Sequence, residues 1–336
     1  MSTLILIFAA ALVFAIGGTP VARRLALRLG VINEPTAARF GTRRIPLLGG
    51  IAIYGAFIVA LLLFADRFFI AQMVGILVGA TWVSFLGIWD DRVTLHPLAK
   101  LLGQILGALV LVATGVTVEF LRQPILNVAV TVVWVVGITN ALNLLDNMDG
   151  LCGGVAAIAS LFFLLLAVMN GQILVGSLAA ALLGASLGFL LYNFNPASIF
   201  MGDAGALFLG FVLAAVGIKL RFPNNIDLVT WMAPVFVLGL PIFDTTLVVL
   251  SRLRRRVPFY VGGKDHLSHR LVRMGLTTRE AVMALYLIAG ASGVLAMFVT
   301  QADWLEAYIV AGTAAVAALI ALWRLEVNQA TRQSGN

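Results

Sequence analysis

The sequence predicts an all-α membrane protein, a polytopic bundle of about eleven transmembrane helices in one domain over residues 1–336. Two observations carry this prediction. The chain is 61% hydrophobic and only 11% charged, with a mean hydropathy of +1.04, whereas a typical soluble domain carries about 25% charged residues. Long apolar runs also recur along the chain, without the alternation of apolar and polar residues that marks the strands of membrane barrels.

Each predicted span is an apolar run close to the roughly 20 residues that cross the hydrocarbon core as a helix. The runs lie at 3–19, 47–65, 68–89, 98–117, 127–145, 151–169, 173–191, 204–220, 229–250, 281–300 and 305–323. Basic residues follow the first run and none precedes it, which favours a retained first span over a cleaved signal peptide. The predicted cytoplasmic loops lie at about 20–46, 90–97, 146–150, 192–203 and 251–280.

The basic residues predict the orientation, with the N-terminus outside and the C-terminus in the cytoplasm. All but four of the 22 Lys and Arg residues then fall in cytoplasmic segments, as the positive-inside rule requires. The four exceptions are Arg67, Arg122, Lys219 and Arg221. Topology therefore accounts for the net charge of +7, and we expect membrane lipid rather than nucleic acid as a partner. The basic segment 21–32 suits either a helix along the headgroups or a solvated loop.

Aspartates gather at the cytoplasmic ends of the predicted spans. A carboxylate at a membrane boundary is costly unless it is paired or bound to a metal. Seven of them on one side of one bundle suggest a shared cation. A single cysteine excludes an internal disulfide and a cysteine-based metal site. The seven residues are Asp90, Asp91, Asp146, Asp149, Asp203, Asp244 and Asp265.

The stretch "GIWDDRVTLHPLAK" (87–100) places two adjacent carboxylates after one span and a lysine at the start of the next. A charged turn between the two spans is the simpler interpretation of Asp90 and Asp91 taken alone. A site for a cation or a phosphate, with Lys100 beside it, is the functional interpretation.

The stretch "NALNLLDNMDGLCGG" (140–154) is unusually polar for this chain. If the helix continues through it, Asn143, Asp146 and Asp149 recur every three residues and lie near one face. Such a face could offer oxygen ligands to a hard cation, and the glycines would let a ligand approach the backbone closely. A polar turn with a glycine cap is the alternative.

Two further stretches complete the set. In "YNFNPASIFMGDAGALFLG" (192–210), Asp203 precedes a span and is either a helix N-cap or a ligand-binding carboxylate. In "GGKDHLSHRLVRMG" (262–275), His266 and His269 lie in one basic loop. Two histidines without cysteine are a weak zinc signal, and a contact to phosphate or sugar nucleotide suits this basic loop better.

Together these stretches place carboxylates for a divalent cation and bases for phosphates on one membrane face. This combination suits transfer of a phosphorylated group from a soluble cytoplasmic donor to a lipid in the inner leaflet. The main alternative is a cation- or proton-coupled secondary transporter, but transporters place such groups near the bilayer midplane between paired repeats. A membrane scaffold without catalytic activity would leave the convergence of acids and bases unexplained.

Five motifs resemble one known family, the polyprenyl-phosphate N-acetylhexosamine-1-phosphate transferases, which include the WecA and TagO enzymes and, more distantly, MraY. They are "RRIPLLGG", "GIWDD…LAKLLGQ", "NALNLLDNMDGLCGG", "NPASIFMGDAGALFLG" and "DHLSHRLVRMG", in family order over residues 43–275. The resemblance implies eleven spans in the bacterial inner membrane and a Mg²⁺ cofactor, with Mn²⁺ as a substitute. It also implies transfer of GlcNAc-1-phosphate or a related sugar phosphate from a UDP-N-acetylhexosamine to undecaprenyl phosphate, with release of UMP, as the first membrane step of an envelope polysaccharide.

The resemblance also implies roles for the matching residues. Asp203 would be the principal Mg²⁺ ligand, with Asn143 beside the metal. Lys100 would meet the phosphates, Asp149 the uracil, and Asp90 would act as a base or position the lipid phosphate. The implied catalytic residues are Asp90, Asp91, Asp146 and His269. The implied substrate-binding residues are Lys100, Asn143, Asp149, His266 and Arg270.

The chain departs from the family pattern at two places. The loop motif H-x-H-H has Ser268 in place of its second histidine, and we expect this change to affect sugar specificity. The motif D-G-L-D-G reads D-N-M-D-G, with Asn147 in place of the first glycine; both acids remain, and we expect little effect. The sequence leaves open the sugar epimer, the polysaccharide pathway and the choice between a monomer and a homodimer.

Overall fold

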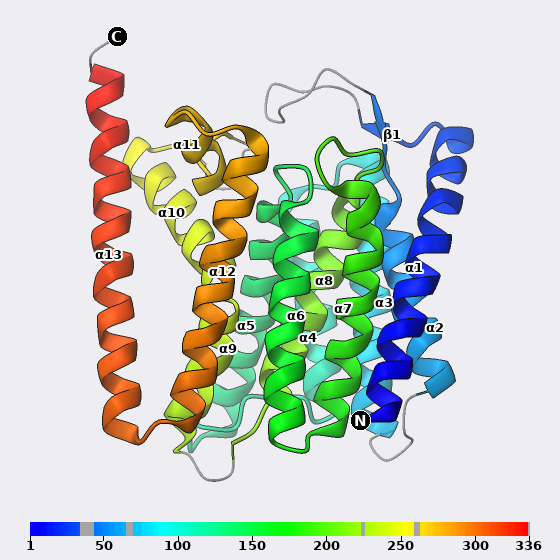
Figure 1. Cartoon of the computed structure of the whole chain (residues 1–336), viewed down its shortest axis with the longest axis horizontal. Coiled ribbons are helices and arrows are strands. Elements are labelled where there is room, and N and C mark those ends of the chain that lie inside the picture. The colour runs from blue at the N-terminus through cyan, green and yellow to red at the C-terminus, as the bar shows by residue number, and fades with distance from the viewer. Residues whose placement is uncertain (34–43, 65–69, 223–225, 259–262, 335–336) are drawn as a thin grey trace.

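A computed structural model describes residues 1–33, 44–64, 70–222, 226–258 and 263–334 of the chain. Predictions for residues 34–43, for Arg67 and for residues 259–262 lie outside this part. Thirteen helices and one two-stranded sheet make up what the structure describes (Figure 1). In chain order they are α1 (Ser2–Leu29), β1 (Ile32–Asn33), β2 (Ile45–Pro46), α2 (Gly49–Phe64), α3 (Ile70–Val93), α4 (Pro97–Ala113), α5 (Pro124–Leu145), α6 (Leu151–Met169), α7 (Ile173–Asn193), α8 (Gly202–Lys219), α9 (Asp227–Val237), α10 (Gly239–Arg255), α11 (Leu267–Arg273), α12 (Thr278–Gln301) and α13 (Trp304–Ser334).

The predicted all-α membrane bundle is confirmed. Each predicted span coincides with one helix or, at 229–250, with the pair α9 and α10. Eight helices of the described residues are long and apolar enough to cross a membrane, or nine if the bent pair counts as one span, and α2 and α4 are shorter apolar helices. The chain ends lie at opposite ends of the bundle (Figure 1), as an odd number of crossings requires. The count of eleven and the outside position of the N-terminus stay predictions.

Helix α1 runs ten residues beyond the predicted span end at residue 19, into the segment expected along the headgroups or in a solvated loop. Its buried face continues through Ala22 and Ala26. Pro20 has no N–H to donate to the carbonyl of Ile16, but the hydroxyl of Tyr192 donates to that carbonyl at 3.0 Å. The helix therefore continues through the proline and extends beyond the predicted membrane segment.

The predicted span at 229–250 is broken rather than straight. Helices α9 and α10 meet at an angle of 74°. Pro241 lacks the N–H that would bond the carbonyl of Val237 in a continuous helix, so the helix breaks at Leu238. As a result α10 leans across the end of the bundle that holds β1, α11 and the C-terminus (Figure 1). We call this end the site end.

Helix α8 lies at the centre of the bundle, and residues 204–218 are all buried. It packs mainly against α3 and α5. Small residues permit this close packing, as is usual between membrane helices: a Cβ on Gly50 of α2 would lie only 2.2 Å from the backbone nitrogen of Gly205. The first turn of this rigid central helix places Asp203 at the site end.

The segment between α7 and α8 is held by main-chain bonds at the site end. Phe200 donates to the carbonyl of Pro46 in β2, and Gly49 donates to the carbonyl of Phe200, both at 2.9 Å. From the extended part of α1, Arg23 Nε donates to the carbonyl of Ser198 at 3.1 Å. The first two helices thus brace a segment that would otherwise be an unsupported loop.

Candidate active site

Lys100, in the first turn of α4, is surrounded by side chains from three other helices. Its Nζ lies 2.8 Å from Asp90 Oδ2 at the end of α3, and it also pairs with Asp203 Oδ2 on α8. It donates to Asn143 Oδ1 of α5 at 3.2 Å, while Asn143 Nδ2 donates to Asp203 Oδ1 at 2.9 Å. An ammonium group has three hydrogens, and here it has three acceptors. We call Asp90, Lys100, Asn143 and Asp203 the Lys100 cluster.

Asp91 caps the start of α8. Its Oδ1 accepts from the backbone N–H of Asp203 at 2.9 Å and its Oδ2 from that of Ala204 at 3.2 Å, so a carboxylate satisfies the free amides at the positive end of the helix. Gly202 has φ +68°, and a Cβ there would lie 2.5 Å from Asp91 Oδ2. Asp203 is therefore not the N-cap, which was the alternative interpretation, and its side chain is free to face Lys100.

Asp90 is fixed on its other side by the turn that follows α3. Its Oδ1 accepts from the backbone N–H of Leu95 at 2.6 Å. One turn beyond Lys100, the amide of Gln104 donates to Asn140 Oδ1 at 3.2 Å and braces α4 against α5. The sequence stretches quoted above contain Asn140, but the local pattern does not reveal its pairing with α4.

The helix does not continue through this stretch, so Asn143, Asp146 and Asp149 do not share one helical face. The structure shows the alternative, a polar turn that ends at Gly150 with φ +79°. Helix α5 ends at Leu145. The side-chain amide of Asn147 donates to the carbonyl of Leu144 at 2.9 Å and stabilises the turn that follows. Asn143 stays with Lys100, whereas Asp146 lies near enough to Asp91 for their charges to interact. Asp149 lies at the far end of the turn, away from Lys100, and contacts residues 195–197.

Asp149 contacts the segment between α7 and α8. Its Oδ2 accepts from Asn195 Nδ2 at 3.1 Å and from the backbone N–H of Ala197 at 2.9 Å. The buried Asn193 adds a second link, because it accepts from the N–H of Gly150 and donates to the carbonyl of Ile199. Sequence reasoning missed Asn193, although a polar side chain near the end of an apolar helix was the available signal.

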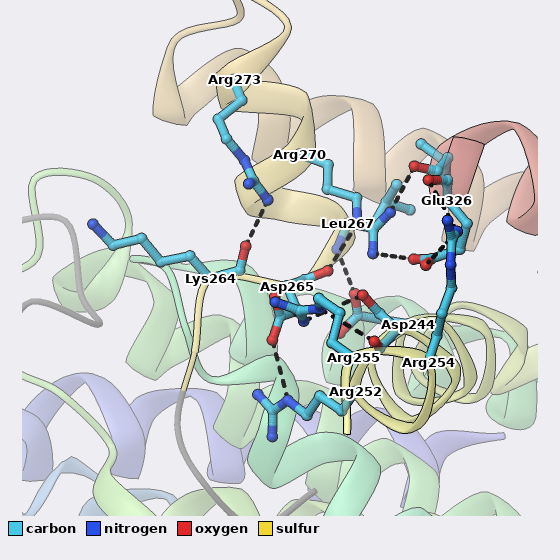
Figure 2. A network of polar contacts seen from close by, with 12 residues as sticks. Asp244, Arg252, Arg254, Arg255, Lys264, Asp265, Leu267, Arg270, Arg273 and Glu326 are labelled. Carbon is cyan, nitrogen blue, oxygen red and sulfur yellow. Dashed lines mark hydrogen bonds and ion pairs between the residues drawn. The ribbon is translucent and has the colours of Figure 1, made fainter. Parts of the chain in front are cut away.

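The predicted histidine loop is anchored by α10 and α13, as Figure 2 shows. Asp244 of α10 accepts from the N–H of Leu267 at 2.7 Å and lies 2.7 Å from His266 Nδ1. Asp265 pairs with Arg252 at 3.1 Å and with Arg255 at 2.6 Å. Burial raises the pKa of Asp265, but these two guanidinium groups outweigh it and hold the pKa below its usual value.

Arg270 is not brought to the Lys100 cluster. It is buried, and its guanidinium donates to the carbonyls of Asp265 and Leu325 at 2.9 and 2.8 Å and pairs with Glu326 of α13 at 2.6 Å. The seven aspartates do not share one cation site. Asp90 and Asp203 lie in the Lys100 cluster, Asp244 and Asp265 lie in a second network, and the other three lie in neither. We call the second network, drawn in Figure 2, the loop cluster. Its members are Asp244, Arg252, Arg254, Arg255, Asp265, His266, Arg270 and Glu326.

His269 is buried in the first turn of α11, beside Ser268 and 5.9 Å from the ring of His266. Ser268 Oγ donates to Asn147 Oδ1 at 2.6 Å. The histidine loop therefore contacts the turn between α5 and α6, the same turn that carries Asp146 and Asp149.

The sequence is similar to those of known proteins over most of its length. A model described as glycosyl transferase family 4 matches residues 73–221. A probable undecaprenyl-phosphate N-acetylglucosaminyl 1-phosphate transferase of Bacillus subtilis (strain 168) is 34% identical over 302 residues, covering 87% of this chain and 84% of the relative. The chain belongs to glycosyl transferase family 4.

Other members of the family are also similar to this chain. A decaprenyl-phosphate N-acetylglucosaminephosphotransferase of Mycobacterium tuberculosis (strain ATCC 25618 / H37Rv) is 30% identical over 341 residues, covering 89% of this chain and 84% of the relative. A phospho-N-acetylmuramoyl-pentapeptide-transferase of Levilactobacillus brevis is 34% identical over 185 residues, covering 49% of this chain and 55% of the relative. The resemblance predicted from the motifs is confirmed, and this family member is a multi-pass membrane enzyme.

The donor atoms of the Lys100 cluster suit a hard divalent cation. Within the described residues, no three or more His, Cys, Asp or Glu side chains form a group that could hold a metal ion. Mg²⁺ does not need such a cage, because it usually takes one or two carboxylates together with waters and substrate phosphates. The oxygens of Asp203 and Asn143 already surround one cation, the ammonium of Lys100. The Lys100 cluster therefore contains oxygen ligands of the kind that Mg²⁺ prefers.

Proposed function

We propose that this protein transfers GlcNAc-1-phosphate, or the phosphate of a closely related N-acetylhexosamine, from its UDP conjugate to undecaprenyl phosphate. An oxygen of the lipid phosphate bonds to the sugar-bearing phosphorus, and the bond from that phosphorus to the bridging oxygen breaks. The products are UMP and a lipid-linked sugar diphosphate. Glycosyl transferase family 4 membership and the polyprenyl-phosphate sugar transferases among its relatives support this reaction class.

The Lys100 cluster is the observation that carries the proposal. Both substrates are anions, so the site must neutralise charge before two phosphates can approach. Lys100 is the cation that would bind an incoming phosphate oxygen. That oxygen would replace one of the three present acceptors of the ammonium group. The Asp203 side chain is 31% exposed, whereas that of Asp90 is 11% exposed. A ligand would therefore enter beside Asp203.

Mg²⁺, or Mn²⁺ in its place, is the proposed cofactor, with Asp203 as the principal ligand and Asn143 beside it. When bound, it would neutralise the diphosphate and stabilise the charge on the leaving UMP. The charges already present support a further cation, because Asp90 and Asp203 share the single ammonium of Lys100. Asp91 and Asp146 add negative charge nearby.

Asp90 fits the role of positioning the lipid phosphate better than that of an obligatory base. A phosphate monoester has a second pKa of about 6 and is mostly ionised near neutral pH, so its oxygen needs no proton removed. Contacts with Lys100 and with the N–H of Leu95 hold both oxygens of Asp90 in place. Asp90 can therefore orient Lys100 toward the acceptor phosphate.

The turn after α5 is the proposed nucleotide side of the site. Asp149 links this turn to residues 195–197, and we assign the uracil contact to Asp149 together with that segment. Asp146, in the same turn, lies near Asp91 and adds negative charge near the proposed cation site. We assign a contact with the donor to the histidine loop, in which His266 and His269 are buried, while Arg270 holds that loop from within.

We place the reaction at the cytoplasmic face of the bacterial inner membrane. The site end carries Arg23, Arg24, Arg28 and the arginines at the end of α10, which the positive-inside rule assigns to the cytoplasm. UDP-sugars are soluble cytoplasmic donors, so a site at this end would have direct access to them.

The deciding experiment combines purified protein in detergent with UDP-GlcNAc, undecaprenyl phosphate and Mg²⁺, and follows UMP release and the lipid product. We expect UMP and lipid-linked GlcNAc in equal amounts, and neither when the lipid is left out. UDP-GalNAc and UDP-glucose in parallel reactions identify the sugar. Hydrolysis of the donor without lipid, or no reaction with any of the three sugars, would contradict the proposal.

A further inference from the structure

Helix α12 contacts both segments that meet at Asp149. Near the start of the helix, Arg279 Nε and Nη2 donate to the carbonyl oxygen of Asn195 at 3.0 and 2.7 Å. Two helical turns later, the hydroxyl of Tyr286 donates to the carbonyl oxygen of Gly150 at 2.5 Å. Residues seven positions apart lie on one face of a helix. A single face of α12 therefore holds both the residue that follows Asp149 and the residue whose side chain donates to it.

The position of Tyr286 depends on a glycine. A Cβ on Gly154 would lie only 1.9 Å from the hydroxyl oxygen of Tyr286. We expected the glycines of this stretch to let a ligand approach the backbone, but at Gly154 that space holds the phenol of Tyr286. The half-buried hydroxyl is satisfied by the carbonyl of Gly150. Removing the hydroxyl should therefore loosen the turn that carries Asp149.

Apolar packing joins α12 to the same turn and to the histidine loop. Leu285 of α12 shares one buried apolar cluster with Met148 and Leu151, which lie on either side of the turn's last carboxylate. Leu267 of the histidine loop belongs to the same cluster, and residues 274–277 join α11 directly to α12. Helix α12 is therefore a common support for the two parts of the site that we assign to the donor.

The orientation of Asp149 depends on the segment that Arg279 holds. Both hydrogen bonds to the carboxylate end on Oδ2, one from the Asn195 side chain and one from the N–H of Ala197. Oδ1 takes part in neither and, within the described residues, accepts no other hydrogen bond. It is therefore the oxygen that can accept from a ligand, and a displacement of residues 195–197 would turn it.

We propose that Arg279 and Tyr286 are positioning residues for donor binding, which fix from α12 the two segments that orient Asp149 toward uracil. This inference rests on the proposed function, because it explains how the uracil-binding carboxylate is held. Neither residue is assigned a contact with the nucleotide. Arg279 is exposed, and substitutions of exposed residues usually change the free energy of unfolding little. Its loss should therefore affect nucleotide affinity more than stability.

The first test measures the dissociation constant of UMP by calorimetry, on purified protein in detergent with Mg²⁺. We expect Arg279→Gln to weaken binding about fivefold and Tyr286→Phe about tenfold, the range for one lost hydrogen bond. The KM for the UDP-sugar should rise in parallel while the KM for undecaprenyl phosphate stays constant. Arg279→Lys keeps a charged donor and should retain most of the affinity. Tyr54→Phe is the matched control, since it removes a hydroxyl that bonds Thr81 at 2.9 Å between α2 and α3.

The second test asks whether both residues act through Asp149. In an Asp149→Ala background, Arg279→Gln and Tyr286→Phe should weaken UMP binding by less than about a further twofold, because the carboxylate that they orient is absent. A long-range effect of the Arg279 charge on the UMP phosphate would persist in that background. Full losses there, or unaltered UMP affinity in both single variants, would overturn the proposal.

Hydrogen exchange followed by mass spectrometry separates this inference from the proposed function, because it needs neither substrate nor turnover. Amides in residues 194–201 should exchange faster in Arg279→Gln than in the unmodified protein or in Tyr54→Phe. If the unmodified protein transferred sugar phosphate and bound UMP, but the variants matched it in affinity and exchange, only this inference would fail. If the unmodified protein did neither, the proposed function and the nucleotide role would fail together, whereas faster exchange would still establish that α12 holds this segment.

Discussion

The Lys100 cluster and the loop cluster hold their charges in opposite ways. In the first, carboxylates outnumber the single ammonium, and Asp203 stays 31% exposed. In the second, each arginine has carboxylate or carbonyl partners, and Arg252 is only 1% exposed. An excess of carboxylate at a partly exposed place favours a cation and a phosphate. In the loop cluster arginines outnumber carboxylates, and the buried pairs of Arg252 and Arg270 hold the loop in place.

This difference separates two residues, Lys100 and Arg270, to which the sequence alone assigns similar roles. Lys100 and Arg270 are both basic, and both were expected at the phosphates. Lys100 lies where the ends of α3, α4, α5 and α8 meet and is 16% exposed. Arg270 is 4% exposed and is enclosed between its own loop and α13 (Figure 2). The type of side chain is therefore a weaker guide to function than the balance of charge around it.

The largest expected effect comes from removing divalent cations. The Lys100 cluster has an excess of carboxylate, and both substrates are anions, so turnover should stop in EDTA. Mg²⁺ or Mn²⁺ added back should restore UMP release, measured on the same purified sample. Full turnover in the presence of chelator would show that Lys100 alone supplies the positive charge.

The second largest effect is expected for Asp203→Asn, which removes one negative charge from the Lys100 cluster. We expect turnover to fall by about two orders of magnitude or more, because the cation loses its principal ligand. Thermal unfolding should be close to that of the unmodified protein. Near-normal turnover at ordinary Mg²⁺ concentrations would remove Asp203 from the proposed metal site.

Asp265→Asn makes the matching change in the loop cluster and should lower the stability of the folded protein. Breaking the buried pair with Arg252 should cost about 3 kcal/mol, seen as a lower Tm, with the Mg²⁺ requirement unchanged. The pKa of Asp265 is lowered in the folded protein, so its contribution is present above the ordinary value of about 3.9 and is lost only as pH falls through the folded pKa. The deficit in Tm should therefore be constant from about pH 6 to pH 8.

A variant with normal Tm but an altered Mg²⁺ titration would place Asp265 with the Lys100 cluster and remove the contrast between the two regions.

The smallest expected effect concerns Asp149, which belongs to neither cluster. Asp149→Ala should raise the KM for the UDP-sugar roughly tenfold, because a site built around a hydrogen bond loses affinity when the bond is removed. Inhibition by UMP should weaken in parallel, with the Mg²⁺ requirement unchanged. If UMP inhibition stayed normal while the Mg²⁺ requirement shifted, Asp149 would be a metal ligand and the uracil contact would belong to residues 192–202.

Local sequence was sufficient for the apolar helices and for all four members of the Lys100 cluster. The predicted end of the fifth span at residue 145 coincides with the end of α5. Asp90, Lys100, Asn143 and Asp203 are all recognisable in the sequence. Each stands out because it is polar beside a long apolar run, and burying such a group without a partner is costly. Proline effects were harder to predict, since α1 continues through Pro20 whereas α10 breaks from α9 near Pro241.

The sequence by itself therefore determined the membrane bundle, its apolar helices and the polar residues at their ends, because hydropathy and composition are local properties. Only the tertiary structure decided which polar groups meet. Asp91 caps a helix 112 residues away, Arg270 pairs across 56 residues, and Ser268 reaches Asn147 across 121. Such pairs depend on how the helices pack, and no window of sequence contains both partners.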